Sequence, residues 1–328
     1  MVSFVKRALI LAPLVFGIAG GVPAYAQDKA LEPLLINYTF PNAIWWNIDV
    51  AIDKGFLRDE GFAPEGTPFQ NSPQAVQLLV SKSVHVAVIQ PEALMDADLK
   101  GAGLVAVVQT ETRPDWLLVV PADSAGWSDI KGKSVGFSSL KVNEVWLTER
   151  LLAAHGLKKT DWDALQVGVT PLKVAALSKG SIAASPLFQP GAQQAVKQGL
   201  KPIARYDELG DCPPSLVVVN KSWAAENNHG ARLVRGLARA HAWLYDSANR
   251  AEAEAILSKY TKADLDIAHQ VYDILFITDK IYTRDGAIDM KGLKAALQLV
   301  ADSGSIAADK LPAPESLVLP LEMGGIRH

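Results

Sequence analysis

Residues 121–157 read PADSAGWSDIKGKSVGFSSLKVNEVWLTERLLAAHGL, and this stretch decides the fold class. It opens with a turn at 123–126 and continues with an apolar strand over 134–137. The pattern then predicts a helix over 143–154 that stops at Gly156, because glycine commonly follows the last turn of a helix. A strand that runs directly into a helix is one βα unit, the building block of α/β folds.

The same rhythm extends toward the N-terminus. Short apolar runs predict strands at 33–39, 62–67, 84–89, 104–108 and 116–120. Between them the sequence predicts helices over 42–53, from Ser72, and from Pro91. This alternation predicts a mostly parallel sheet with helices on both faces. The carboxyl ends of such strands share one edge, where ligands bind.

Toward the C-terminus the pattern continues and then becomes helical. We predict helices over 173–179 and 192–198, and strands at 166–169 and 216–219. Thr160 and Asp163 have the spacing of a capping box. From residue 228 onward the chain is mainly helical, and Leu233, Leu237, Ala240 and Leu244 share one face.

We interpret this order as an α/β fold with two lobes and a ligand cleft between them. The first lobe comprises 27–121 and 215–328, including the C-terminal helices, and the second lobe comprises 122–214. Two crossover segments then connect the lobes as a hinge.

The N-terminus resembles an export signal. Lys6 and Arg7 precede an apolar run of about 15 residues, and Ala24-Tyr25-Ala26 forms a signal-peptidase site. We expect 1–26 to be a cleavable signal peptide, which would leave Gln27 first. The alternative is a membrane anchor, but the run is shorter than the roughly 20 apolar residues that span a bilayer.

Composition excludes several classes of partner and site. The formal net charge is −3, and the basic residues are dispersed, so we expect no binding to nucleic acid. The single cysteine, Cys212, allows no internal disulfide, and the six histidines show no metal-ligand spacing. We therefore expect no metal and no cofactor. We also expect the protein to be a monomer.

Three segments together resemble a known family. Within 121–157, the family's turn and strand entry are matched by Asp123, Ser124, Lys131, Gly132, Lys133, Val135 and Gly136. Residues 51–57 (AIDKGFL) and 177–180 (LSKG) resemble two of its helix ends. In this respect the chain is similar to periplasmic substrate-binding proteins for nitrate, sulfonates, taurine and thiamine precursors. Lys82, His85 and Ala183 depart from the family's pattern.

The resemblance implies a two-lobe periplasmic binding protein fold of type II, found in the periplasm. Such a protein closes on a small organic ligand and docks on the membrane permease and cytoplasmic ATPase of an ABC importer. Ligand identity is not carried over from any member.

Topology predicts where the ligand binds, because strand ends line the cleft. The candidates in the first lobe are Phe40, Asn42, Trp45, Trp46, Asn71, Gln90 and Arg113. Those in the second lobe are Ser138, Ser139, Val142, Asn143 and Ser185.

Each candidate has a functional and a structural interpretation. Ser138 and Ser139 precede a helix, where free N–H groups attract an anion, or they serve only as a cap. Arg113 could clamp a carboxylate or sulfonate, or form a surface ion pair with Glu111 or Asp115. Trp45 and Trp46 could stack on an apolar ligand body, although one of them should face the core. The set favours an organic anion, either an aromatic carboxylate or an organosulfonate.

We expect a binding protein and no enzyme. Ser138 to Lys141 matches Ser-x-x-Lys, but the companion motifs of serine β-lactamases are absent. One alternative is a protein of the same fold that binds or makes a thiamine pyrimidine precursor. Another is a periplasmic binding partner of a sensor.

Overall fold

The computed structural model describes residues 30–38, 42–68 and 72–320, and its largest sheet has five strands. Strands β3 and β4 are buried along their whole length, as their unbroken apolar runs predict for a sheet covered on both faces. The strand order is β2-β1-β3-β10-β4. The strands are β1 (Glu32–Tyr38), β2 (Phe62–Pro68), β3 (Val86–Ile89), β4 (Leu104–Gln109) and β10 (Leu216–Asn220).

One strand departs from the predicted parallel arrangement. β1 pairs in parallel with β2 and β3, but β10 runs antiparallel to both β3 and β4. The reason is its place in the chain, since β10 returns to this sheet about a hundred residues after β4. The carboxyl ends of β1 to β4 therefore share one edge, and the start of β10 meets them there.

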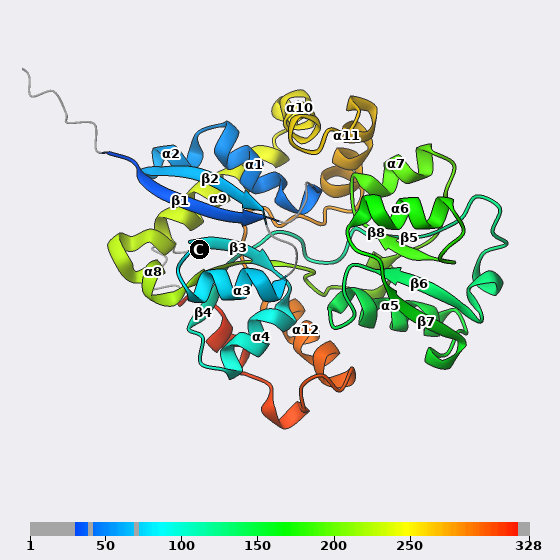
Figure 1. The fold of residues 1–328 in the computed structure, drawn as a ribbon. Helices are drawn as coiled ribbons and strands as arrows, with labels where there is room; N and C mark the ends of the chain where they lie inside the picture. The colour runs from blue at the N-terminus through cyan, green and yellow to red at the C-terminus, as the bar shows by residue number, and fades with distance from the viewer. Residues whose placement is uncertain (1–29, 39–41, 69–71, 321–328) are drawn as a thin grey trace, which may run out of the picture. The chain divides into compact units, whose positions relative to one another are not determined.

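Two layers of helices cover this sheet, and Figure 1 shows them on opposite faces. One layer contains α1, α2, α9 and α10, and the other contains α3, α4 and α12. The buried face predicted on α9 is confirmed, because Leu233, Leu237, Ala240 and Leu244 are all buried. The helices are α1 (Trp46–Asp53), α2 (Phe56–Asp59), α3 (Ser72–Val80), α4 (Pro91–Leu99), α9 (His229–Tyr245), α10 (Arg250–Thr261) and α12 (Met290–Asp302).

The middle of the chain forms two smaller sheets with their own helices. Antiparallel β5 pairs with β8 and β9, and β6 pairs in parallel with β7. A bridge between Val135 and Ala184 links the two sheets. The elements are β5 (Leu117–Val120), β6 (Lys133–Phe137), α5 (Asn143–Ala154), β7 (Trp162–Gln166), α6 (Thr170–Ser178), β8 (Ser185–Leu187), α7 (Gly191–Lys197) and β9 (Lys201–Arg205).

We call the five-stranded sheet with its helices the first lobe, and the elements from β5 to β9 the second lobe. We count β5 with the second lobe because it pairs with β8 and β9, whereas the lobe boundary after Pro121 stays a prediction. The first crossover between lobes is thus 110–116, and the second follows η4 (Tyr206–Leu209) and ends before β10.

Two local predictions in the second lobe were wrong. The strand expected at 166–169 lies earlier, at β7, and the expected capping box at Thr160 is absent. Instead, the Asp161 carboxylate accepts the Lys158 N–H at 2.9 Å, which closes the short helix η3 (Lys159–Asp161). Only Trp162 of β7 is buried, so this strand carries no apolar run that the sequence could reveal.

Most of the remaining elements belong to the first lobe, and η2 lies in the second lobe between β5 and β6. α11 packs against α10, and the π-helical turn η7 follows α11 directly. They are η1 (Ala43–Trp45), η2 (Trp127–Ile130), α8 (Lys221–Ala225), η5 (Glu226–Asn228), η6 (Ser247–Asn249), α11 (Leu265–Tyr272), η7 (Asp273–Thr278), η8 (Ala308–Lys310) and η9 (Pro314–Leu317).

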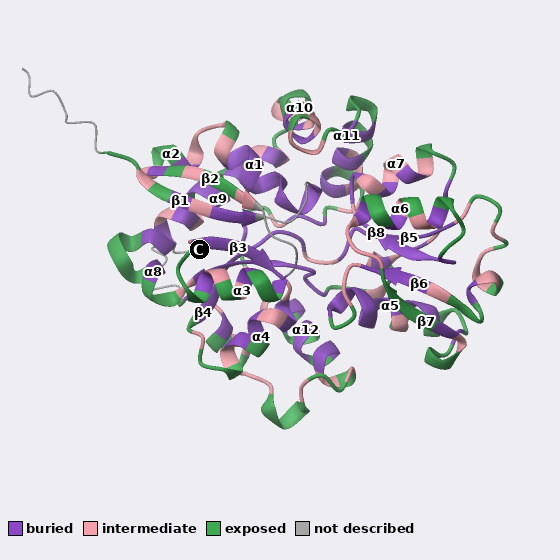
Figure 2. Cartoon of the chain, viewed as in Figure 1, coloured by how far each residue is buried: buried purple, intermediate pink, exposed green. Residues whose placement is uncertain are grey.

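Burial follows the layers, with the central strands and the inner helix faces closed to solvent (Figure 2). Trp46 is fully buried, and its ring meets Tyr272 and Phe276 edge-on at 6.0 and 5.4 Å. Among the helices of residues 30–320, none combines the length and the apolar character needed to cross a bilayer. The predicted signal peptide, 1–26, lies outside the described residues.

Candidate functional site

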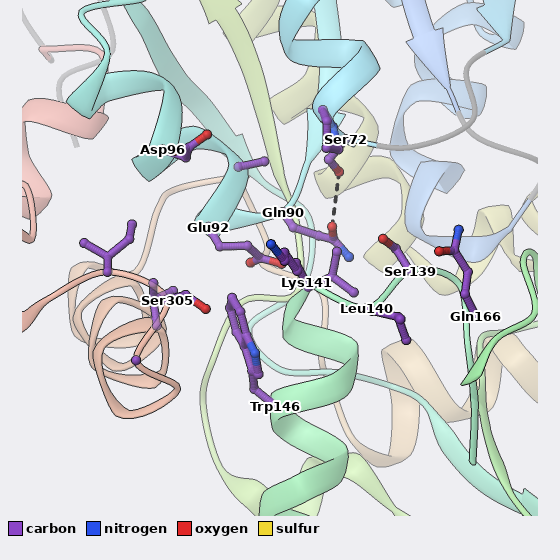
Figure 3. Close-up of a pocket in the computed structure, with 16 residues that line it drawn as sticks. Ser72, Gln90, Glu92, Asp96, Ser139, Leu140, Lys141, Trp146, Gln166 and Ser305 are labelled. Atoms are coloured by element: carbon purple, nitrogen blue, oxygen red, sulfur yellow. Dashed lines mark hydrogen bonds between the residues drawn. The ribbon is translucent and has the colours of Figure 1, made fainter. Parts of the chain in front are cut away.

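A cavity of about 880 Å³ lies where loops of the two lobes meet. Figure 3 shows Gln90 and Glu92 from the first lobe, and Ser139, Lys141 and Trp146 from the second, around this space. Its lining also includes Ser72, Val142, Gln166 and residues 304–306. The volume lies within the range of small-molecule sites, roughly 300–1,000 Å³.

Strand ends position these side chains. Gln90 follows β3 and precedes α4, so it stands at the edge where the strands of the first lobe end. Ser139 follows β6, and Gln166 ends β7, so both come from the corresponding edge of the second lobe. This is the placement that the α/β topology predicts for ligand contacts.

Gln90 links the two lobes. Its amide oxygen accepts the Ser72 hydroxyl at 3.2 Å, and its amide nitrogen donates to Asn143 Oδ1 at 3.2 Å. Asn143 also donates from its backbone N–H to Glu92 Oε1 at 2.6 Å and from its side chain to the Pro214 carbonyl at 3.0 Å. One residue at the start of α5 therefore contacts two segments of the first lobe.

The N–H groups around the start of α5 already have carboxylate partners. Ser138 donates from its backbone N–H to Glu144 Oε2 at 3.0 Å and from its hydroxyl to the same oxygen. The Asn143 N–H is taken by Glu92. Glu144 thus occupies the donors of Ser138, one of the two serines predicted to bind an anion, while Ser139 lines the cavity.

Glu144 is also one half of a buried ion pair. Lys173 Nζ lies 2.5 Å from Glu144 Oε1, and both side chains are closed to solvent. The same ammonium lies 4.4 Å from the centre of the Phe188 ring. Burial lowers the pKa of Lys173, and Glu144 opposes that effect. The pair ties α6 to α5 beside the cavity.

Glu92 is the buried acid of the cavity wall. It is 7% exposed, and this burial raises its pKa to about 7, against an ordinary value of 4.5. Hydrogen bonds from backbone N–H groups partly oppose the rise. Glu92 therefore titrates close to neutral pH.

Two further acids lie in the first crossover. Glu111 and Asp115 are 0% and 4% exposed, and all four of their carboxyl oxygens lack a hydrogen-bond partner among the described residues. Burial raises the pKa of Asp115 to about 7, and burial together with Asp115 raises the pKa of Glu111 well above its ordinary range.

Both lobes enclose this carboxyl pair. From the second lobe, the Gln189 amide donates to the Asp115 backbone carbonyl at 3.4 Å, and the Gln189 carbonyl accepts the Ala43 N–H at 2.9 Å. Between η7 and α12, Tyr282 forms a β-bridge with Glu111, and the Tyr282 hydroxyl donates to the Ala43 carbonyl.

The structure brings only some predicted residues to the cavity. Gln90, Ser139 and Val142 line it, and Asn143 and Ser138 lie directly behind its wall. Phe40 and Asn71 lie outside the described residues, so their contact with a ligand stays a prediction.

The other predicted residues have structural partners. Trp45 and Trp46 lie in the core at 4% and 0% exposure, and Trp46 Nε1 donates to the Ala253 carbonyl at 3.1 Å. Asn42 caps η1 by accepting the Ile44 N–H at 2.8 Å. The buried Ser185 hydroxyl donates to the Gly136 carbonyl at 2.7 Å.

Arg113 is also engaged. Its guanidinium donates to the Asp279 carbonyl at 2.8 Å and to Asp211 Oδ1 at 3.4 Å. Neither Glu111 nor Asp115, the partners considered from sequence, accepts from it. The acceptors of Arg113 are therefore distant in sequence, and the two nearby acids are buried without it.

Glu92, Lys141, Trp146 and Gln166 also line the cavity but were not among the predicted site residues. Glu92 had a usable signal, since an acid three residues after a strand end stands in the first turn of α4. Gln166 had none, because β7 was misplaced. Within the described residues, no group of three or more His, Cys, Asp or Glu side chains could hold a metal ion.

Solved structures share this fold. The alkanesulfonate-binding protein SsuA of Xanthomonas axonopodis pv. citri, bound to MOPS, is 20% identical with a TM-score of 0.69, covering 90% of this chain and 98% of that one. The periplasmic nitrate-binding protein NrtA of Synechocystis PCC 6803 is 16% identical with a TM-score of 0.70, covering 89% and 91%. These likenesses establish the two-lobe periplasmic binding protein fold.

Sequence similarity gives the family. A formylaminopyrimidine-binding protein of Halalkalibacterium halodurans is 27% identical over 160 residues, which are 48% of this chain and 48% of that protein. The match thus spans about half the length of this curated relative. The NMT1-like family matches residues 46–258, well over half of the chain. The chain belongs to the NMT1-like family.

Proposed function

We propose that this protein is the exported solute-binding component of an ABC importer and binds a small organic molecule between its lobes. One observation carries the proposal: the 880 Å³ cavity is lined by strand-end residues of both lobes. The family and the fold agree with such a role. Relatives are named for binding alkanesulfonate, nitrate and formylaminopyrimidine.

A ligand in this cavity would stabilise the closed arrangement. A ligand shifts an open-closed equilibrium only through contacts that it gains in one state. In the structure Gln90 and Asn143 already join the lobes at the cavity wall. A molecule that contacts both walls would add to these bonds, and closing of hinged lobes is a common mode of ligand capture.

Export and docking belong to the same proposal. The residues 1–26 would direct the chain to the periplasm and be cleaved there. The mature protein would act as a monomer, deliver its ligand to a membrane permease, and depend on a separate ATPase. We propose binding rather than catalysis, because the relatives and structural neighbours of this chain are named for binding.

The organic anion favoured by the sequence stays the first candidate, because the predicted residues Gln90 and Ser139 line the cavity. Two of its predicted contacts, Arg113 and Ser138, are paired with protein acceptors. A nitrogen-rich ligand, such as the pyrimidine in the name of one relative, is the second candidate. The buried, unpaired oxygens of Glu111 and Asp115 favour it.

Thermal unfolding of residues 27–328 against a ligand panel tests the binding role. The panel contains aromatic carboxylates, sulfonates, taurine, nitrate and aminopyrimidines. A ligand that binds only the folded state raises the melting temperature with concentration, by about 2.7 kcal/mol of stability at a hundred times Kd. We expect one class to do so and to lose its effect in a variant with Gln90 replaced by alanine. Absence of any shift across the panel would contradict the binding role.

A further inference from the structure

Asn143 joins the two lobes through its hydrogen bonds. It begins α5 and is only 3% exposed. Its backbone N–H donates to Glu92 at 2.6 Å, and its side-chain oxygen accepts from Gln90 at 3.2 Å. Its side-chain nitrogen donates to the Pro214 carbonyl in the second crossover at 3.0 Å. Glu92 and Gln90 belong to the first lobe, so two of these bonds must break when the lobes separate.

Glu92 is buried by residues of both lobes. It lies in the first turn of α4 and is 7% exposed. Lys141 and Trp146 of the second lobe surround the same space, as Figure 3 shows, and residues 304–306 form part of this wall. We call the arrangement in which Asn143 bonds to Glu92 the closed one. Movement of the second lobe away from α4 would admit water to the Glu92 carboxyl.

The cavity places few charges near Glu92. The other charged side chains among its described lining residues are Asp96 and Lys141, and both are exposed. Asp96 is paired with Lys100 at 2.6 Å. α12 and residues 304–306 add only uncharged side chains to the lining. Backbone N–H groups, and no cation among the described residues, therefore oppose the cost of burying a charged Glu92.

The groups behind Glu92 do not compensate its charge either. On the second crossover, Cys212 is 5% exposed, and burial followed by the charge of Glu92 raises the pKa of its thiol to about 12, so the thiol stays neutral. On α5, Arg150 is exposed and Glu144 is paired with Lys173. Ionisation of Glu92 in the closed arrangement is thus costly, and burial is the main cause.

Opening of the lobes would remove this cost. In the closed arrangement burial raises the pKa of Glu92 to about 7, and in water the carboxyl returns to its ordinary value near 4.5. The closed arrangement thus holds the proton more tightly, and protonation favours closing. This contribution is complete below about pH 4.5 and is lost as the pH rises through 7. Protonation leaves the bond from Asn143 in place, because one oxygen of a neutral carboxyl still accepts an N–H.

We propose that Glu92 and Asn143 form a proton-dependent latch, which holds the two walls of the cavity together at acidic pH and releases them above neutral pH. They act as positioning residues, because they set the distance between the walls that a ligand contacts. Apparent affinity falls with the fraction of molecules in the binding-competent state, so the latch would make ligand affinity weaker as the pH rises. This inference rests on the proposed binding function and adds its regulation.

Energy transfer between two fluorescent dyes on the ligand-free protein measures the latch. Gln77→Cys on α3 and Ala154→Cys on α5 place one exposed dye site on each lobe. The buried thiol of Cys212, with its raised pKa, should not compete for the dyes. We expect high transfer at pH 5 and lower transfer at pH 8. The ratio of closed to open molecules should fall by about tenfold or more between these values.

Variants in the same labelled protein assign the latch. Glu92→Gln keeps an acceptor for Asn143 and cannot ionise, so we expect high transfer at both pH values. Asn143→Ala removes the bonds from the second lobe, and we expect low transfer at both. Glu65→Gln, at an exposed site, should follow the wild type. A purely structural role would lower the melting temperature of the variants and leave the pH dependence of the transfer unchanged.

The outcomes separate this inference from the proposed function. Transfer that does not change with pH in the wild type, or that changes equally in Glu92→Gln, would overturn the latch. Neither result bears on the binding role, which the thermal unfolding panel tests by itself. If transfer follows pH as expected and no compound in the panel shifts the melting temperature, the latch stands as a property of the lobes and the binding role fails.

Discussion

At the scale of single residues, the chemistry of the cleft is set by where acids are buried. Glu92, Glu111 and Asp115 each hold a carboxyl away from water, and in each case desolvation is the main cause of the raised pKa. Only Glu92 receives a strong hydrogen bond in return, from the Asn143 N–H.

Glu92 predicts a pH dependence of stability. Because its folded pKa of about 7 exceeds its ordinary value of 4.5, the folded state holds an extra proton between these values. The stability that protonated Glu92 contributes is complete below about pH 4.5 and is lost as the pH rises through 7. At 1.36 kcal/mol per pKa unit, the rise in the pKa of Glu92 corresponds to a loss of about 3 kcal/mol of stability at high pH.

Urea unfolding at pH 5 and pH 8 measures this effect. We expect the free energy of unfolding to fall between these values, and to fall less in Glu92→Gln, which keeps the acceptor for Asn143. Glu65→Gln, at an exposed site, should behave as wild type. If the free energy of unfolding fell by the same amount in Glu92→Gln, the pH dependence would come from other groups, of which Asp115 is the first to test.

At the scale of elements, the ion pair between Glu144 and Lys173 joins α5 to α6 behind the cavity wall. Removing one partner leaves a buried charge, which commonly costs about 3–5 kcal/mol. We therefore expect Lys173→Met to lower the free energy of unfolding by that amount. Adding Glu144→Gln to it should recover part of the loss, because the stranded carboxylate is gone.

The control for this pair is Lys100→Met. Lys100 pairs with Asp96 at 2.6 Å, but its side chain is 69% exposed, and exposed pairs contribute roughly 0–1 kcal/mol. Equilibrium unfolding in urea compares the variants. If Lys173→Met lowered the free energy of unfolding no more than Lys100→Met, the buried pair would not hold α6 in place.

The bounds of individual elements show which features could be predicted from the sequence. The bounds of α5 were predicted correctly, because an apolar face ends at Ala154 and Gly156 follows two residues later. β9 was missed, since Lys201 and Pro202 open it and only Ala204 is buried. The candidate site was predicted at the level of loops. Which side chain in a loop stays free depends on partners distant in sequence, such as Asp279 for Arg113, and no local pattern reveals them.

At the scale of the whole molecule, a second contact joins the lobes away from the cavity. Lys197 on α7 lies 2.9 Å from both Asp264 and Asp266 at the start of α11. These groups are exposed, and hydrogen bonding to Lys197 lowers the pKa of Asp266. Attraction between exposed charges is strongly screened at high salt, where the Debye length is about 3 Å at 1 M.

The contact predicts that salt opens the ligand-free protein. We expect 1 M NaCl to increase the radius of gyration measured by small-angle X-ray scattering. Lys197→Met should produce the same increase at low salt and respond less to added salt. Lys221→Met, on exposed α8, is the control and should match wild type. A radius that stays constant in salt would show that these charges do not hold the lobes together.

The place of β10 in the largest sheet has a consequence for biogenesis. β10 fills the gap between β3 and β4, yet it is synthesised after the entire second lobe. Until then, β4 has no strand partner and β3 is paired only with β1, so a nascent chain cannot complete this sheet. Pairings so distant in sequence form slowly. If the chain is exported as proposed, this delay would help it to stay unfolded while it threads a secretory channel, and its unpaired strand edges would require chaperones that prevent aggregation.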